Sequence, residues 1–192
     1  MRNTRNLSLA LVAALALGTA ACSKNATSDE AVATDSADIA SGAAATPSGT
    51  ATGGAAQFLT DAMKGDNSEI KLGKLAVSKS ASSGVQNFGN MLVADHGKAK
   101  RDVASLATSM NIPTTDDTTP DADAEYTKLQ GMSGADFDKE FVSFMVQGHQ
   151  KAIAQFQQEA ASNDPQPVKQ LASQTLPTLQ KHLKTAQSLQ QK

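Results

Sequence analysis

The side chains best able to carry chemistry in this chain are its three histidines, His96, His149 and His182, together with Glu69. Each histidine falls inside a different amphipathic helical pattern, and Glu69 falls inside a fourth. Neutral imidazole is the commonest protein ligand of metal ions, and a carboxylate adds the charge that a cation needs. We therefore predict a mononuclear site for zinc, copper or iron from these four residues. The alternative is a set of interior histidines, each hydrogen-bonded to the backbone, to Glu69 or to water.

Other metal chemistries fit the spacing less well. A di-iron bundle needs Glu-x-x-His on two helices, but the residues three before the histidines are Val93, Val146 and Leu179. The sequence holds one cysteine, too few for a thiolate pair. It also lacks a glycine-rich phosphate loop and suggests no Ser-His-Asp arrangement. Met145 lies four residues before His149, and a thioether beside an imidazole would favour copper, although buried methionine more often fills gaps in a core.

The elements that must position these residues are helices. Apolar residues recur at helical spacing from about residue 55 onward, and neither alternating strand patterns nor Asn-Gly turns occur. We predict helices over residues 55–80, 83–110, 122–129 and 133–161, and a last one that ends near 189. Asn163 or Asp164 is the expected cap of the last helix, with Pro165 in its first turn. Pro177 predicts a kink in that helix, or its division in two. The predicted fold is all-α, an up-down-up-down four-helix bundle with a short extra helix between its second and third long helices.

The heights of the four residues along such a bundle can be estimated from the helical rise. If the turns near 81 and 163 mark one end, Glu69 and His96 lie about 18 and 22 Å from that end. His149 then lies about 21 Å from it and His182 about 28 Å. Three heights agree within one turn, and His182 is about one turn too far, a gap that a kink at Pro177 would close.

The first residues resemble an export signal, which we predict over residues 1–21. Arg2 and Arg5 precede an apolar run from Leu7 to Leu17, and small residues follow. The run is shorter than the ~20 apolar residues that span a membrane. Cys22 comes directly after it, as at a bacterial lipoprotein processing site, so we predict lipidation of Cys22 and anchoring in the outer membrane. Ordinary signal-peptidase cleavage is the alternative.

Residues 22–54 are predicted to be a disordered linker and residues 55–192 the folded domain. The linker is rich in Ala, Ser, Thr, Gly and Asp and has too little apolar surface to offset the entropy of ordering. Without the two arginines of the signal, 15 basic residues face 19 acidic ones, a net charge of −4. This charge, with no basic run and no tryptophan, argues against nucleic acid as a partner.

Several segments carry a family resemblance. They are Ser68-Glu69-Ile70-Lys71-Leu72-Gly73-Lys74-Leu75-Ala76, Met91-Leu92-Val93-Ala94-Asp95-His96, Phe137-Asp138-Lys139-Glu140-Phe141-Val142, Gly148-His149-Gln150-Lys151-Ala152 and Leu176-Pro177-Thr178-Leu179-Gln180-Lys181-His182-Leu183. Together they resemble the bacterial exported family called domain of unknown function 4142, grouped with ferritin-like bundles, over about residues 56–190. The resemblance implies a periplasmic or outer-membrane protein without a settled activity, and it implies that Glu69, His96, His149 and His182 are characteristic positions. The ferritin-like label concerns the fold and does not transfer iron storage.

Three functions follow from these patterns. The first is a lipid-anchored envelope protein that binds one metal ion through Glu69 and the three histidines. The second is a non-catalytic binding or structural module in which the histidines are structural. The third is a pH-responsive bundle, because protonating buried imidazoles in acid would oppose folding. An enzyme is the least supported class. The sequence indicates the membrane as a partner, through the lipid anchor, and does not identify a protein partner.

Overall fold

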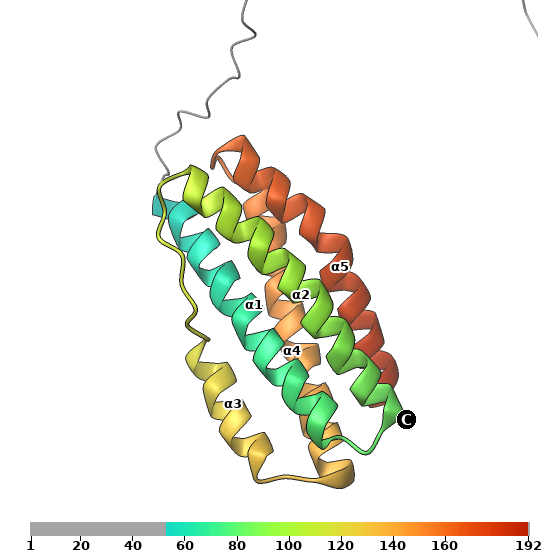
Figure 1. The fold of residues 1–192 in the computed structure, drawn as a ribbon. Helices are drawn as coiled ribbons and strands as arrows, with labels where there is room; N and C mark the ends of the chain where they lie inside the picture. Colours follow the sequence, from blue (N-terminus) through green and yellow to red (C-terminus); the bar gives the residue numbers. More distant parts are fainter. Residues whose placement is uncertain (1–52, 192) are drawn as a thin grey trace, which may run out of the picture. The chain divides into compact units, whose positions relative to one another are not determined.

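The helical patterns fold into five helices in the computed structural model, which describes residues 53–191. Four of the helices are long and lie side by side, with the short α3 on their outside (Figure 1). Their bounds are α1 Gly53–Lys79, α2 Ser83–Ser109, α3 Pro120–Gln130, α4 Gly134–Ala160 and α5 Gln166–Gln190. Within residues 53–191 no strand is present, and no helix is long and apolar enough to cross a membrane. The predicted signal peptide, Cys22 and nearly all of the predicted linker lie outside the described residues.

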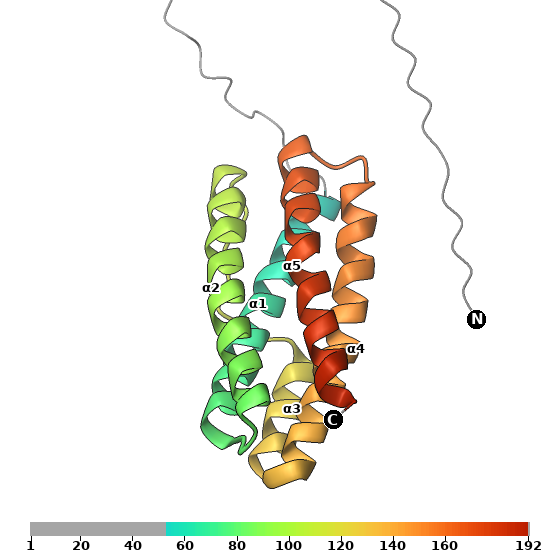
Figure 2. The same ribbon diagram turned by 90° about the vertical axis from the view of Figure 1, so that its right-hand side faces the viewer.

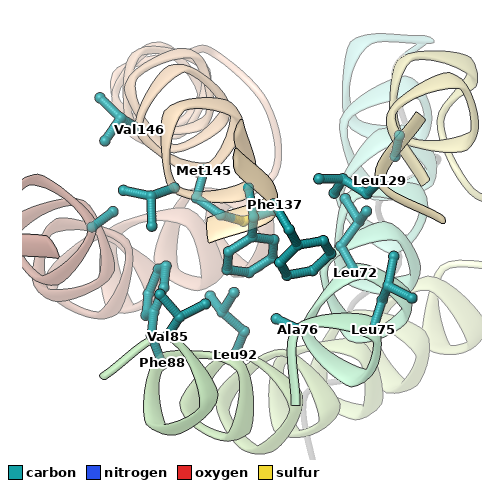
Figure 3. Close-up of a cluster of buried hydrophobic side chains, with 14 residues drawn as sticks. Leu72, Leu75, Ala76, Val85, Phe88, Leu92, Leu129, Phe137, Met145 and Val146 are labelled. Carbon is teal, nitrogen blue, oxygen red and sulfur yellow. The ribbon is translucent and has the colours of Figure 1, made fainter. Parts of the chain in front are cut away.

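The apolar core consists of two clusters, one toward each end of the long helices. One cluster gathers Leu72, Phe88, Phe141 and Met145 with other residues of α1 to α5, as Figure 3 shows in part. The other gathers Phe58, Leu59, Met63, Val103, Phe156 and Val168 with their neighbours. Glu69, His96, His149 and His182 each fall between the two clusters along their own helix. The polar residues therefore form a layer that interrupts the core near its middle.

The order of the two clusters along each helix gives the chain directions. In α1 and α5 the Phe58 cluster comes first, whereas in α2 and α4 the Leu72 cluster comes first. Helices α2 and α4 therefore run in the same direction, as Figures 1 and 2 also show. The predicted up-down-up-down order is wrong in this respect, because it requires α2 and α4 to run in opposite directions.

The connection between α2 and α4 explains this order. It returns along α1: the Asn67 side-chain amide donates to the carbonyls of Thr115 and Asp117 at 3.1 and 2.9 Å, and Lys79 Nζ donates to the carbonyl of Gln130. The chain from residue 115 to 130 thus runs beside residues 67–79 and back to the end where α2 began. A connection this long crosses the bundle, so α4 starts where α2 started.

Helices α1 and α2 approach each other at two glycines. A Cβ placed on Gly73 would lie 2.8 Å from the carbonyl oxygen of Gly89, and one on Gly89 would lie 2.7 Å from that of Gly73. Real Cβ atoms do not approach backbone so closely, so only glycine at both positions lets the two backbones pack here. This contact holds the helices that carry Glu69 and His96 together.

The helix ends follow local signals, with one exception. Ser82 caps α2 by accepting from the Val85 N–H at 3.4 Å, and α4 begins at Gly134, one residue after its predicted start. The predicted cap of α5 at Asn163 or Asp164 is wrong, since Pro165 is the capping residue and no side chain caps the helix. Pro165 and Pro167 both lack an N–H, which leaves fewer donors to satisfy in that first turn. Helix α5 continues through Pro177, so it is not divided in two.

Candidate metal centre

The structure brings the four predicted residues together, one from each long helix. Glu69 lies on α1, His96 on α2, His149 on α4 and His182 on α5. One side-chain atom from each residue lies within 4.8 Å of the corresponding atoms of the other three. Glu69 Oε2 is 2.9 Å from His96 Nε2 and 3.4 Å from His149 Nε2. The centroid of the His182 ring is 5.2 Å from those of His96 and His149.

In each imidazole, the ring nitrogen that faces away from the centre contacts an oxygen atom of another residue. His96 Nδ1 is 2.8 Å from Asp66 Oδ1, His149 Nδ1 donates to the Met145 carbonyl at 2.9 Å, and His182 Nε2 is 2.9 Å from Asp95 Oδ2. Histidines that bind metals nearly always have such a partner, which fixes the ring orientation and the tautomer. The nitrogens left facing the centre are His96 Nε2, His149 Nε2 and His182 Nδ1.

The inward-facing atoms have no hydrogen-bond partner. Among the described residues, five buried side-chain atoms lack one, and four of them are Glu69 Oε2, His96 Nε2, His149 Nε2 and His182 Nδ1. The contact of 2.9 Å between Glu69 and His96 is close enough for a hydrogen bond but is not aligned as one. Buried polar atoms without partners are rare and costly. Four of them converging on one point mark a place where a cation would satisfy all four.

The spacing of these atoms is close to that of a four-coordinate metal. Bonds of 2.0–2.1 Å in a tetrahedron put the ligand atoms about 3.3 Å apart. The distances of 2.9 and 3.4 Å from Glu69 lie near this value, and the widest pair would need to close by at most about 1.5 Å. The four ligand atoms therefore already lie near the spacing that a single ion requires.

The centre holds two opposite charges even without a bound cation, one on His96 and one on Glu69. Burial alone would lower the pKa of His96, but the charge of Glu69 and the hydrogen bond to Asp66 outweigh it and raise that pKa to about 10. Burial would raise the pKa of Glu69, but His96 and His149 outweigh it and lower that pKa to about 2. Burial lowers the pKa of His182. At neutral pH the centre therefore holds an imidazolium at His96 beside a carboxylate at Glu69, and a metal ion must displace the His96 proton.

The estimated heights reached the right conclusion through a wrong assumption. The turns near 81 and 163 lie at opposite ends of the helices, so the two pairs were measured from different ends. His149 is 15 residues from the start of α4 and 11 from its end, so its height differs by about 6 Å between the two ends. His182 lies nearer the end of α5 that packs against the start of α2, where Leu189 reaches Gly84. The four side chains do meet, but the predicted gap of one turn has no meaning, because the two pairs of helices were measured from opposite ends.

Sequence reasoning missed Asp66 and Asp95. Asp66 lies three residues before Glu69 and therefore on the same side of α1, a spacing that could have identified it. Asp95 directly precedes His96, and neighbouring helical residues do not share a face, so its sequence position suggests no contact with that histidine. Its partner is His182 on α5, which no local pattern indicates. Met145 contacts the centre through its backbone carbonyl, which accepts from His149.

The fold and the centre define an all-helical domain whose core is crossed by a layer of histidine and carboxylate. The sequence model of the family described as domain of unknown function DUF4142 matches residues 40–189, and the chain belongs to this family. No curated protein matches the chain. A similar solved structure is the crystal structure of a DUF305 fragment from Deinococcus radiodurans, with a TM-score of 0.66 and 17% sequence identity. The match covers 74% of this chain and 98% of that one, and at this identity it shows a common fold only.

Proposed function

We propose that this protein binds one metal ion through Glu69, His96, His149 and His182. The observation that carries the proposal is the convergence of four buried, unpartnered ligand atoms from four helices on one point. A histidine kept only for packing would be expected to use both ring nitrogens or to expose one of them to water. Here each ring uses one nitrogen for a second contact and turns the other inward.

Three imidazole nitrogens and one carboxylate oxygen suit zinc, copper or iron. Four protein ligands complete a tetrahedral shell, which is typical of sites that hold an ion rather than activate a water molecule. His149 and His182 are 0% exposed. We therefore infer binding, storage or structural stabilisation in preference to hydrolytic chemistry at this centre.

The proposed setting is the bacterial cell envelope. Arg2, Arg5 and the apolar run from Leu7 to Leu17 support export, and Cys22 supports attachment of a lipid. Residues 23–52 would then connect the lipid to the helices. We also infer that the helices form a ferritin-like bundle, since two antiparallel pairs joined by one long crossover are typical of that group.

The test is elemental analysis of the full chain, recovered from the envelope, beside the double variant His96→Ala, His149→Ala. About one metal ion per wild-type chain, lost in the double variant, is the expected result. The matched control is Gln150→Ala, because Gln150 is the exposed neighbour of His149 on α4 and should leave the metal content unchanged. A wild-type chain that binds no added zinc, copper or iron at pH 7.5 would exclude the proposal.

A second function has one observation in its favour. The low pKa of buried His182 means that acid must either protonate it inside the core or unfold the protein. This supports the alternative of a pH-sensing structural module without metal. Replacing the three histidines by glutamine distinguishes the two, because a pH sensor would lose its acid-induced change while a metal protein would lose its ion.

A further inference from the structure

The proposed ligands differ in their access to solvent. His149 and His182 are 0% exposed, whereas the Glu69 side chain is 15% exposed. Glu69 faces a cavity of about 330 Å³ between α1, α4 and the start of α3. Among the residues that line this cavity are Asp61, Gly65, Thr119, Asp121, Gly148 and Lys151. Of the four proposed ligands, Glu69 is the one that lines this cavity.

A smaller cavity shares part of its lining with the first and reaches His96. Its volume is about 70 Å³, and its lining includes Asp66, Glu69 and His96. The two cavities have five lining residues in common, namely Asp61, Gly65, Glu69, Ala152 and Gln155. Together they extend from the surface between α1 and α4 to the ring of His96.

Two glycines without a packing role lie on the cavity wall. Gly65 and Gly148 each lie inside a long helix, where glycine is unfavourable relative to alanine. A Cβ at either position would meet nothing within 4 Å. Gly73 and Gly89 are different, since a Cβ at either one would collide with backbone. The effect of Gly65 and Gly148 is to leave the space beside Glu69 free of side chains.

The charge of the larger cavity favours cations. Asp61, Glu69 and Asp121 line it with one basic residue, Lys151. A hollow lined mainly by one sign of charge concentrates ions of the opposite sign and speeds their association. The acidic groups continue inward through Asp66.

We propose that this cavity is the entry route by which a divalent cation reaches the centre, with Glu69 as the first ligand it meets. This inference rests on the proposed metal function and adds a route to it. Gly65 and Gly148 keep the route open, and Asp61 and Asp121 draw the cation to it. A route of this kind governs the rates of uptake and release and leaves the equilibrium affinity unchanged.

The experiment measures zinc exchange by the full chain. Metal-free protein is mixed with Zn²⁺ and the free ion is followed with a fluorescent indicator, and loaded protein is mixed with excess chelator to follow release. In Gly65→Leu and Gly148→Leu, both rates should fall by at least about tenfold while their ratio stays nearly constant, because entry then requires the helices to move apart. The matched control is Gly97→Leu on α2, where a Cβ would lie 3.9 Å from the Arg101 side chain and outside both cavities.

A second variant tests the route without adding bulk. Asp61→Asn with Asp121→Asn should slow uptake by about three- to tenfold at low salt, and the difference should disappear at high salt. Unchanged rates in the leucine and asparagine variants, with one zinc bound per chain, would overturn the route and leave the metal centre standing. Equal slowing in Gly97→Leu would also overturn it. A wild-type chain that binds no zinc would instead refute the centre itself.

Discussion

Exchanging the Glu69 carboxylate for the amide of glutamine tests the centre without changing its volume. Glu69 Oε2 lies 2.9 Å from His96 Nε2, and both atoms are buried. Glutamine keeps the shape and removes the charge that holds the His96 proton. The variant therefore leaves an imidazolium that has Asp66 as its one remaining carboxylate partner, in a layer between two apolar clusters.

The magnitude follows from the pKa of Glu69, which the centre lowers from 4.5 to about 2. Each pKa unit corresponds to about 1.4 kcal/mol, so the pairing stabilises the folded protein by about 3 kcal/mol. Removing one partner of a buried ion pair costs about 3–5 kcal/mol in general, which agrees. We expect Glu69→Gln to lower the free energy of unfolding of the metal-free protein by about 3 kcal/mol.

The pH of the assay is set by the direction of the two shifts. Glu69 has a lowered pKa, so its contribution is complete above pH 4.5 and is lost as the pH falls through about 2. His96 has a raised pKa, so its contribution is complete below pH 6.5 and is lost as the pH rises through about 10. Both contributions to stability are complete between pH 4.5 and 6.5, so the wild type and the Glu69→Gln variant should be compared at pH 5.5.

The assay is urea unfolding of the full chain with a chelator present. Asp61→Asn is the control, because Asp61 lies two turns earlier on α1 and accepts a hydrogen bond from Gln57 on the surface. It should change the stability by less than about 0.5 kcal/mol. If Glu69→Gln costs less than about 1 kcal/mol, a value typical of exposed ion pairs, the buried pair is not formed in solution and the electrostatic reasoning fails.

Three further predictions concern the supports of the centre. Asp95→Asn removes the charge behind His182 and should weaken zinc binding by about 10–100-fold, measured by competition with a chelator, with the helical circular dichroism unchanged. An affinity equal to that of the wild type would show that Asp95 does not support the ligand. Zinc affinity should rise by about tenfold per pH unit near pH 8, because the His96 proton must leave when the ion binds. One proton should be released per ion in weakly buffered solution. A zinc affinity that does not change with pH would contradict the charge assigned to His96. Gly73→Ala should destabilise the protein by about 1–3 kcal/mol in urea, since its Cβ would lie 2.8 Å from the Gly89 carbonyl, whereas Gly97→Ala should be neutral or stabilising.

The position of the polar layer also affects the stability of the whole domain. The layer divides the core into two apolar clusters, and it leaves four buried atoms without hydrogen bonds. Glu69 Oε2 still gains from its ion pair with His96. Among the described residues, however, His182 Nδ1 has neither a hydrogen bond nor an ion-pair contact, and burying such an atom opposes folding by about 1–3 kcal/mol. A bound cation would remove this penalty and would stabilise the folded state further by mass action. The metal-free chain is thus expected to be markedly less stable than the loaded one.

The sequence by itself determined the helices and indicated the four residues that meet between them. Helical periodicity, turns and caps are local properties, and they placed the long helices within about two residues of their observed ends. Glu69, His96, His149 and His182 were identified because polar residues inside four apolar stripes are exceptional, and stripes that face one core must bring them together. The cap of α5 was misjudged, since two prolines reduce the need for a side-chain cap.

Tertiary structure alone decided the directions of the helices and the supports of the histidines. A connection of given length permits either a return at the same end or a crossover, and the choice depends on contacts such as those of Asn67 with Thr115 and Asp117, which lie far apart in sequence. The pairing of Asp95 with His182 spans 87 residues and two helices. Local sequence patterns indicate which face of a helix is buried. They do not indicate which residue of another helix lies opposite that face, because this depends on how the helices pack in the folded chain.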